Sequence, residues 1–160
     1  MKKICLFIGL IVLSFNMMAQ QRDTTLIHDE VDSTLLEQII YKDSKLIEST
    51  HYIYESLGEL AVTIKFTYRE DGVVDTRTLE NYHNHLLMDR WQYTADEILL
   101  MEEHWKYDHQ NRLISRKQTF YEGAYIDNLI EKRKYKGSIC KVTFYLNNKL
   151  IHEYTDNSSK

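Results

Sequence analysis

Aromatic and charged residues in the second half of the chain have the types and spacing of a binding surface. Trp91 and Trp105 offer flat, amphipathic side chains, which bind sugars, peptides and protein partners well. Glu103, Lys117 and Glu131 follow one another at intervals of 14 residues and alternate in charge. The alternative is that these residues pack in a core. The residues of the predicted binding surface are Trp91, Trp105, Tyr107, Glu103, Lys117 and Glu131.

His83 and His85 are weak candidates for a metal site. If they lie in a strand they share one face, and together they could chelate zinc or copper. A third ligand is not evident in the sequence, and a polar turn accounts for both residues. We therefore expect no bound metal.

The sequence carries no motif for catalysis. Nucleophilic catalysis needs a Ser or Cys with a base and an orienting group. A nucleophile elbow, a phosphate-binding loop and a dinucleotide fingerprint are all missing from the sequence. We therefore predict that the protein is not an enzyme, has no catalytic residues and needs no cofactor.

The composition is that of a folded globular domain. Of the 160 residues, 43% are hydrophobic and 28% are charged, which is too apolar for a disordered chain. The formal net charge of -4 argues against a nucleic-acid partner, which would need a basic face. The 12 tyrosines are unusual beside 5 glycines and no proline.

Residues 1–19 have the pattern of a secretory signal peptide. Lys2 and Lys3 precede an apolar run from Ile4 to Leu13, and Ala19 offers a small residue for cleavage. The run is shorter than the roughly 20 residues needed to span a bilayer. We therefore predict cleavage after Ala19, export to the periplasm or the cell exterior, and no membrane span in the mature chain.

Cys140 is the one cysteine left after this cleavage, so the mature chain cannot form an internal disulfide. We expect it to be a small buried hydrophobic residue rather than a reactive thiol.

Tyrosines recur at a nearly constant interval along the chain. Successive members of the series are separated by 14, 14, 11, 14, 14 and 14 residues, and Tyr41 precedes the first by 13. An aliphatic residue often follows six positions later, as Leu113 follows Tyr107. The series consists of Tyr54, Tyr68, Tyr82, Tyr93, Tyr107, Tyr121 and Tyr135.

This repeat predicts an all-β protein. Turn-forming residues follow each tyrosine, and the segments between them alternate apolar and polar residues, as over 60–68. A repeat of 14 fits one strand of about nine residues and one turn of about five. We predict an antiparallel meander of about nine strands over residues 41–155, built on a Tyr-turn-Leu repeat, in a strongly twisted or rolled sheet.

The tyrosines also suggest a strand register. If each tyrosine pairs with the residue six positions later, the alternating charges of the predicted surface form one row across three strands. The predicted pairs are Tyr107–Leu113, Trp105–Ser115, Glu103–Lys117, Tyr121–Asp127 and Lys117–Glu131.

Four segments depart from the regular repeat. Between Tyr82 and Tyr93 we expect a tighter hairpin or a bulge, and Asn147-Asn148 suits a two-residue hairpin turn. Residues 20–40 form an N-terminal segment that is either a short helix, capped by Thr34 and Glu37, or another strand. Residues 156–160 form a polar tail that we expect to be disordered.

The turn Tyr107-Asp108-His109-Gln110-Asn111-Arg112-Leu113 resembles the YD repeat of Rhs-type proteins, whose unit is Tyr-Asp, two variable residues and Gly-Arg-Leu. Asn111 replaces the glycine, and the turns after Tyr54 and Tyr68 lack both the Asp and the Arg. The resemblance covers residues 41–145. It implies an extracellular β-sheet protein; the toxin-carrying role of large members does not transfer to so short a chain.

Together these features predict an exported, non-catalytic β-repeat protein with an interaction or structural role. One alternative is a small-ligand module that binds a glycan or a peptide on an aromatic and charged sheet face. Another is a secreted inhibitor or immunity-like partner. The expected partner is a protein or a glycan, and not a nucleic acid.

Overall fold

The computed structural model describes residues 22–29, 34–55 and 58–156. The predicted signal peptide, its cleavage site and residues 157–160 of the predicted tail lie outside this range.

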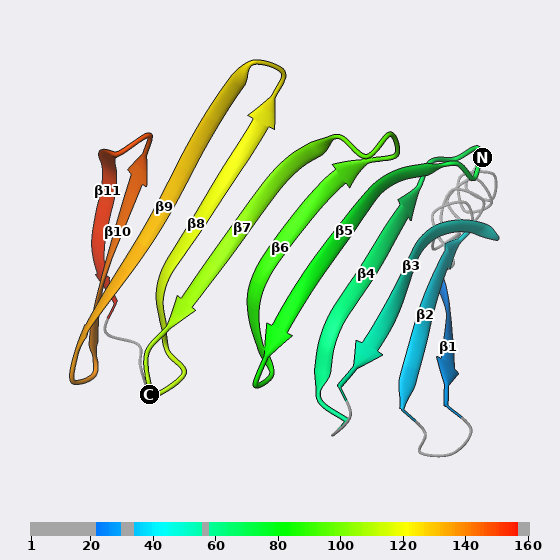
Figure 1. The fold of residues 1–160 in the computed structure, drawn as a ribbon, viewed down its shortest axis with the longest axis horizontal. Coiled ribbons are helices and arrows are strands. Elements are labelled where there is room, and N and C mark those ends of the chain that lie inside the picture. The colour runs from blue at the N-terminus through cyan, green and yellow to red at the C-terminus, as the bar shows by residue number, and fades with distance from the viewer. Residues whose placement is uncertain (1–21, 30–33, 56–57, 157–160) are drawn as a thin grey trace, which may run out of the picture.

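The described chain forms one antiparallel sheet of eleven strands, in which neighbouring strands follow the chain order from β1 to β11 (Figure 1). This confirms the predicted all-β meander, and no helix occurs among the described residues. The strands are β1 (Arg22–His28), β2 (Leu35–Lys42), β3 (Lys45–Tyr54), β4 (Leu60–Tyr68), β5 (Val74–His83), β6 (Leu86–Thr94), β7 (Leu99–Tyr107), β8 (Leu113–Glu122), β9 (Tyr125–Lys136), β10 (Ile139–Leu146) and β11 (Lys149–Asp156).

The N-terminal segment extends the sheet by two strands beyond the predicted nine. Its strand alternative is correct and its helix alternative is wrong, because residues 35–42 form β2, which pairs with β1 and β3. The sheet therefore begins at Arg22 and not near Tyr41. At the other end, Asp156 completes β11 rather than starting a tail.

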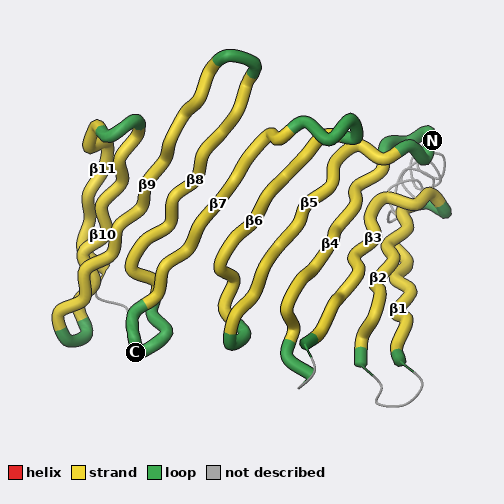
Figure 2. Tube along the Cα trace, viewed as in Figure 1, coloured by secondary structure: helices red, strands yellow, loops and turns green. Residues whose placement is uncertain are grey.

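The sheet is a single open layer (Figure 2). In the described part of the chain each strand contacts only its neighbours in the sheet, and β1 and β11 each have one unpaired edge. Long side chains must therefore cover one another on the sheet surface, because no second layer shields them. Nine of the residues that the structure describes are buried, namely Ile40, Ser49, Thr50, Thr63, Glu103, Thr119, Glu131, Cys140 and Val142.

In the first half of the repeat, the pair Tyr52 and Leu60 and the pair Phe66 and Tyr68 do not form a buried core, because all four residues are only half-buried. The two pairs also lie on opposite faces of the sheet, since Tyr52 pairs with Thr63 while Phe66 pairs with Ser49. The predicted burial of Cys140 is confirmed, because this residue is 5% exposed.

The nine turns from β2 to β11 are of two kinds. Three of the five two-residue turns, Asp43-Ser44, Asn84-His85 and Asn147-Asn148, have positive φ at both residues, which is the type I′ geometry of tight hairpins. The tight hairpin predicted after Tyr82 and the two-residue turn predicted at Asn147-Asn148 are thus confirmed. The longer turns contain a hydrogen-bonded four-residue turn that ends in one residue of positive φ, namely Gly58, Gly72, Glu97 and Asn111.

A tyrosine is the last or second-to-last residue of every strand from β2 to β10, and it pairs across the turn with an aliphatic residue or with Cys140. Tyr107, for example, pairs with Leu113 as predicted, and Tyr93 pairs with Leu99. In most hairpins an extra residue follows this pair, such as Ile114 after Leu113, and forms a β-bulge. The nine tyrosines are Tyr41, Tyr54, Tyr68, Tyr82, Tyr93, Tyr107, Tyr121, Tyr135 and Tyr145.

These bulges make part of the predicted register wrong. Trp105 pairs with Arg116 rather than Ser115, and Glu103 pairs with Gln118 rather than Lys117, because Ile114 is the extra residue.

Because the turn between β8 and β9 has only two residues, Tyr121 pairs with Ile126 instead of Asp127, and Lys117 pairs with Ile130 instead of Glu131. Arg116, not Lys117, is the residue opposite Glu131.

We call the side of the sheet that carries Glu103 face A and the side that carries His104 face B. Seven of the nine buried residues lie on face A, and Ser49 and Thr119 lie on face B. Face A is therefore the better covered surface.

Candidate functional site

A network of ion pairs crosses the middle of face A. Glu103 on β7 is fully buried, and its carboxylate accepts hydrogen bonds from Arg90 on β6 and from Arg116 on β8. The Arg90 Nη1 and Arg116 Nε atoms each lie 2.9 Å from a Glu103 oxygen. The strands position these three residues because Arg90 is the direct cross-strand partner of Glu103 and Arg116 lies on the diagonal.

The network continues toward the N-terminal half through Glu80 on β5. Arg90 also donates to Glu80, with 2.8 Å from Nε to Oε1. Tyr82 and Thr63 donate to the other Glu80 oxygen at 2.7 and 2.9 Å. Burial opposes the charged form of this carboxylate, but hydrogen bonds from Tyr82, Thr63 and Arg90 outweigh it and lower the pKa of Glu80.

The pKa values of Tyr82 and Arg90, which donate to Glu80, shift upward. Burial and the hydrogen bond to Glu80 raise the pKa of Tyr82 to about 12. For Arg90, burial disfavours the charged form, yet the carboxylates of Glu80 and Glu103 raise its pKa above the usual value. The charges of Glu80 and Arg90 therefore stay in place across the physiological pH range.

Trp105 lies under this network. The guanidinium carbons of Arg90 and Arg116 lie 5.3 and 5.7 Å from the Trp105 ring centroid. Such cation–π contacts stabilise the fold but occupy the surface that a ligand would stack on.

Two further residues of the predicted binding surface lie on face A in structural contacts. The Tyr107 hydroxyl donates to the Leu87 carbonyl oxygen at 2.9 Å, and Tyr135 makes the same kind of bond to Leu113 at 3.0 Å. Glu131 is buried and accepts from Arg133. The structure thus brings Trp105, Tyr107, Glu103 and Glu131 to one face.

The other two predicted residues, Trp91 and Lys117, lie on face B. Trp91 contacts His104 edge-on, with ring centroids 6.4 Å apart. His104 Nδ1 lies 2.6 Å from an Asp89 carboxylate oxygen, which anchors the ring. Lys117 pairs with His104 across the strands and is exposed.

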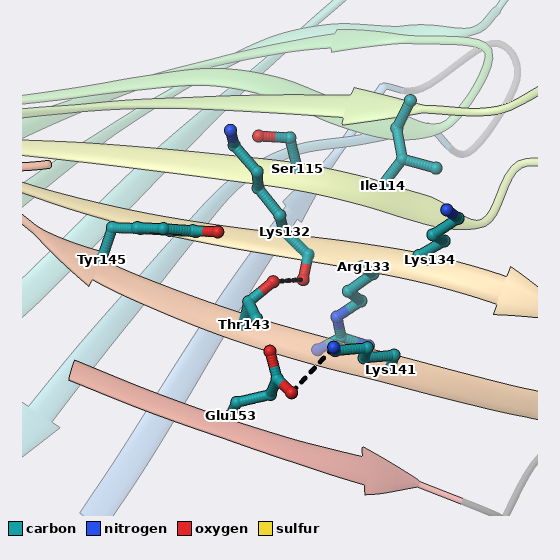
Figure 3. Close-up of a pocket in the computed structure, with 9 residues that line it drawn as sticks. All are labelled: Ile114, Ser115, Lys132, Arg133, Lys134, Lys141, Thr143, Tyr145 and Glu153. Carbon is teal, nitrogen blue, oxygen red and sulfur yellow. Dashed lines mark hydrogen bonds and ion pairs between the residues drawn. The ribbon is translucent and has the colours of Figure 1, made fainter. Parts of the chain in front are cut away.

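Face B also carries a hollow of about 580 Å³ over β8 to β11 (Figure 3). Lys132 and Lys134 on β9 and Lys141 on β10 lie on its wall, and all three are exposed. Lys141 forms an ion pair of 2.7 Å with Glu153 on β11, while the Lys132 ammonium lies 5.2 Å from the Tyr145 ring centroid. Ser115 and Thr143 add hydroxyl groups.

No family model matches the chain. A search of curated proteins likewise finds no match. Among solved structures, the chain is similar to a protein of unknown function from Bacteroides fragilis, with a TM-score of 0.48 and 11% sequence identity over 89% of this chain and 94% of that one.

Within residues 22–29, 34–55 and 58–156 no three His, Cys, Asp or Glu side chains converge as metal ligands. His83 and His85 are both exposed, and His85 occupies a turn position with a φ of 63°. The described residues also contain no helix that could cross a membrane.

The lysines of the hollow escaped the sequence analysis. Their signal was the run Lys132-Arg133-Lys134, in which alternate residues point to opposite faces of a strand. Arg133 turns to Glu131 on face A, so only the two lysines reach face B. Lys141 was not predictable, because its position depends on the two-residue turn Gly137-Ser138.

Proposed function

We propose that this protein is an exported, non-catalytic binding module that presents a ligand-binding surface on face B. The observation that carries the proposal is the single open layer, since a sheet whose faces are both uncovered offers a wide platform. Large apolar side chains such as Ile126, Ile139 and Ile151 are exposed on it, at 56%, 47% and 52%. Exposed apolar surface of this extent is typical of interaction sites.

Face B supports binding better than face A. On face A, Glu103 and Arg116 satisfy one another and Arg116 covers Trp105, so these charges and this ring are not free for a ligand. On face B, exposed lysines surround a hollow within the size range of ligand sites. This reverses the weight that the sequence analysis gave to Trp105.

Site-specific photo-crosslinking in the native host tests the proposal. Phe144 and Tyr145 are neighbours in β10 and point to faces A and B respectively. We expect a photoreactive phenylalanine at Tyr145 to form a reproducible adduct with a cell-envelope or extracellular component. The same residue at Phe144 is the matched control and should form none.

The proposal fails if the exported, folded protein forms no adduct at Tyr145. It also fails if the adduct at Phe144 is equally strong, because binding would then not depend on face B. A far-ultraviolet circular dichroism spectrum like that of the wild type verifies that each labelled variant is folded.

A further inference from the structure

The hollow on face B contains ammonium groups that are not neutralised by carboxylates. Lys141 has Glu153 as its ion-pair partner, but neither Lys132 nor Lys134 forms an ion pair with any residue that the structure describes. Figure 3 shows the three lysines and Glu153 around one space. An anion entering this space would meet two uncompensated positive charges.

The hollow belongs to a larger basic region of face B. Lys106 and Lys117 extend it across β7 and β8, and both are exposed. Glu102 and Glu153 are the acidic residues on the same face of β7 to β11, and Tyr121 donates to Glu102 at 2.8 Å. Lys136 lies on this face as well, and six lysines against two carboxylates give the region a positive charge although the whole chain carries -4.

The remaining wall of the hollow is suited to a hydroxyl-rich ligand. Ser115 contributes a hydroxyl group, and Thr143 has a further acceptor lone pair beyond its bond to the Lys132 carbonyl oxygen at 3.3 Å. The Tyr145 ring and the exposed Ile114 side chain add apolar surface. Sugars need this combination of hydrogen-bonding groups and flat apolar surface, whereas a bare inorganic anion does not.

We infer that the hollow formed by Lys132, Lys134 and Lys141 binds an acidic carbohydrate, a glycan whose sugars carry carboxylate or sulfate groups. Ammonium groups pair with the acidic substituents, and the hydroxyls of Ser115 and Thr143 meet sugar hydroxyls. The three lysines lie on two adjacent strands, where Lys134 is directly opposite Lys141 and Lys132 is two residues away along β9. This inference names the ligand class of the proposed binding module and rests on that function.

The experiment measures the affinity of the purified mature protein by calorimetry for four defined probes. The probes are an oligogalacturonate, a dextran sulfate oligosaccharide, neutral dextran and single-stranded DNA. We expect binding to one or both acidic oligosaccharides, which separates carboxylate from sulfate recognition, and none to dextran. Affinity should fall as salt concentration rises.

Two triple variants locate the site. Lys132→Ala, Lys134→Ala and Lys141→Ala together should weaken oligosaccharide binding at least about tenfold. The control combines Lys42→Ala, Lys45→Ala and Lys149→Ala, which removes the same charge outside the hollow and should leave affinity unchanged. Circular dichroism verifies that both variants fold.

Equal losses of affinity in the two variants would overturn the inference, because the oligosaccharide would then be attracted by the net charge of the protein and not by the hollow. Binding to neither acidic oligosaccharide, or tighter binding to DNA, would overturn it as well. A Tyr145 adduct that persists in cells despite such a result would leave the binding module intact and show that its ligand belongs to another class.

Discussion

Over β6 to β10, both faces of the sheet carry charged and aromatic residues, but the charges are paired on face A and the lysines are exposed on face B. On face A, Glu103 holds Arg90 and Arg116 at hydrogen-bonding distance, and both guanidiniums cover Trp105. On face B, Lys132 and Lys134 extend toward solvent around a hollow. The difference shows that charge and aromatic content alone do not distinguish the two faces. What distinguishes them is whether the charged groups already have ion-pair partners within the protein.

A single-layer sheet explains why face A needs its ion pairs. Without a second layer, the apolar rings and methylene groups of one face can be covered only by long side chains of neighbouring strands. Arg90 and Arg116 do this for Trp105, and Glu103 fixes their position. The faces can therefore be told apart by substitutions, which we give in order of expected effect.

Glu103→Ala should cause the largest loss of stability. It leaves the guanidiniums of Arg90 and Arg116 without their shared carboxylate, and breaking a buried ion pair from one side costs about 3 kcal/mol or more. Urea unfolding followed by circular dichroism measures the change. Glu102→Ala, one residue away on face B, is the control and should cost about 1 kcal/mol. Equal effects would show that face A has no special structural role.

Trp105→Ala should lower the free energy of unfolding by about 2 kcal/mol, since a half-buried ring and two cation–π contacts are lost. Affinity for any ligand of face B should not change. A thermal unfolding curve and a binding isotherm of this variant measure the two effects. A variant that keeps its stability but loses binding would return Trp105 to the binding surface and reverse the roles of the faces.

Arg116 and Lys117 are adjacent residues with the same charge, and the register assigns them to opposite faces. Arg116→Ala should cost about 1–2 kcal/mol because hydrogen bonds to a buried carboxylate disappear. Lys117→Ala should change stability by no more than about 0.5 kcal/mol. Chemical denaturation of the two variants measures both losses of stability. A larger loss in Lys117→Ala than in Arg116→Ala would favour the register without a bulge at Ile114.

Alkaline pH should weaken face A gradually. The pKa of Tyr82 is about 12 in the folded protein and close to 10.0 in the unfolded chain. Because the folded value is the higher one, this contribution to stability is complete below pH 10 and disappears as the pH rises from 10 to 12. The free energy of unfolding should therefore fall over this window, and it should fall less in Tyr82→Phe. Identical pH profiles would show that Tyr82 does not titrate with the network.

Much of the architecture follows from the sequence. The tyrosines mark strand ends because each is followed by residues suited to a reversal, and the pairs Tyr107–Leu113 and Tyr54–Leu60 occur as predicted. The bulge at Ile114 has no local signal, since isoleucine suits a regular strand position equally well. One extra residue was enough to place Arg116 in the charge row, where Lys117 was predicted.

The candidate site was less predictable for the same reason. The face of a side chain depends on every bulge and turn between it and its neighbours, so Lys141 and Lys132 meet only once the turn at Gly137-Ser138 is known. The sequence analysis placed Trp91 with Trp105 because it counted strand positions without the bulge before Met101.

The alternation of the tyrosines has a consequence in symmetry. Tyr54, Tyr82, Tyr107 and Tyr135 lie at or next to the ends of alternate strands on face A, whereas Tyr68, Tyr93 and Tyr121 lie at the opposite rim on face B. Consecutive repeats are thus related by a two-fold screw axis that runs along the sheet, perpendicular to the strands. Duplicating one repeat would move everything downstream to the other face relative to what precedes it. Duplicating a pair, 28 residues, would preserve both faces, so such a sheet can lengthen or shorten without inversion only by two strands at a time.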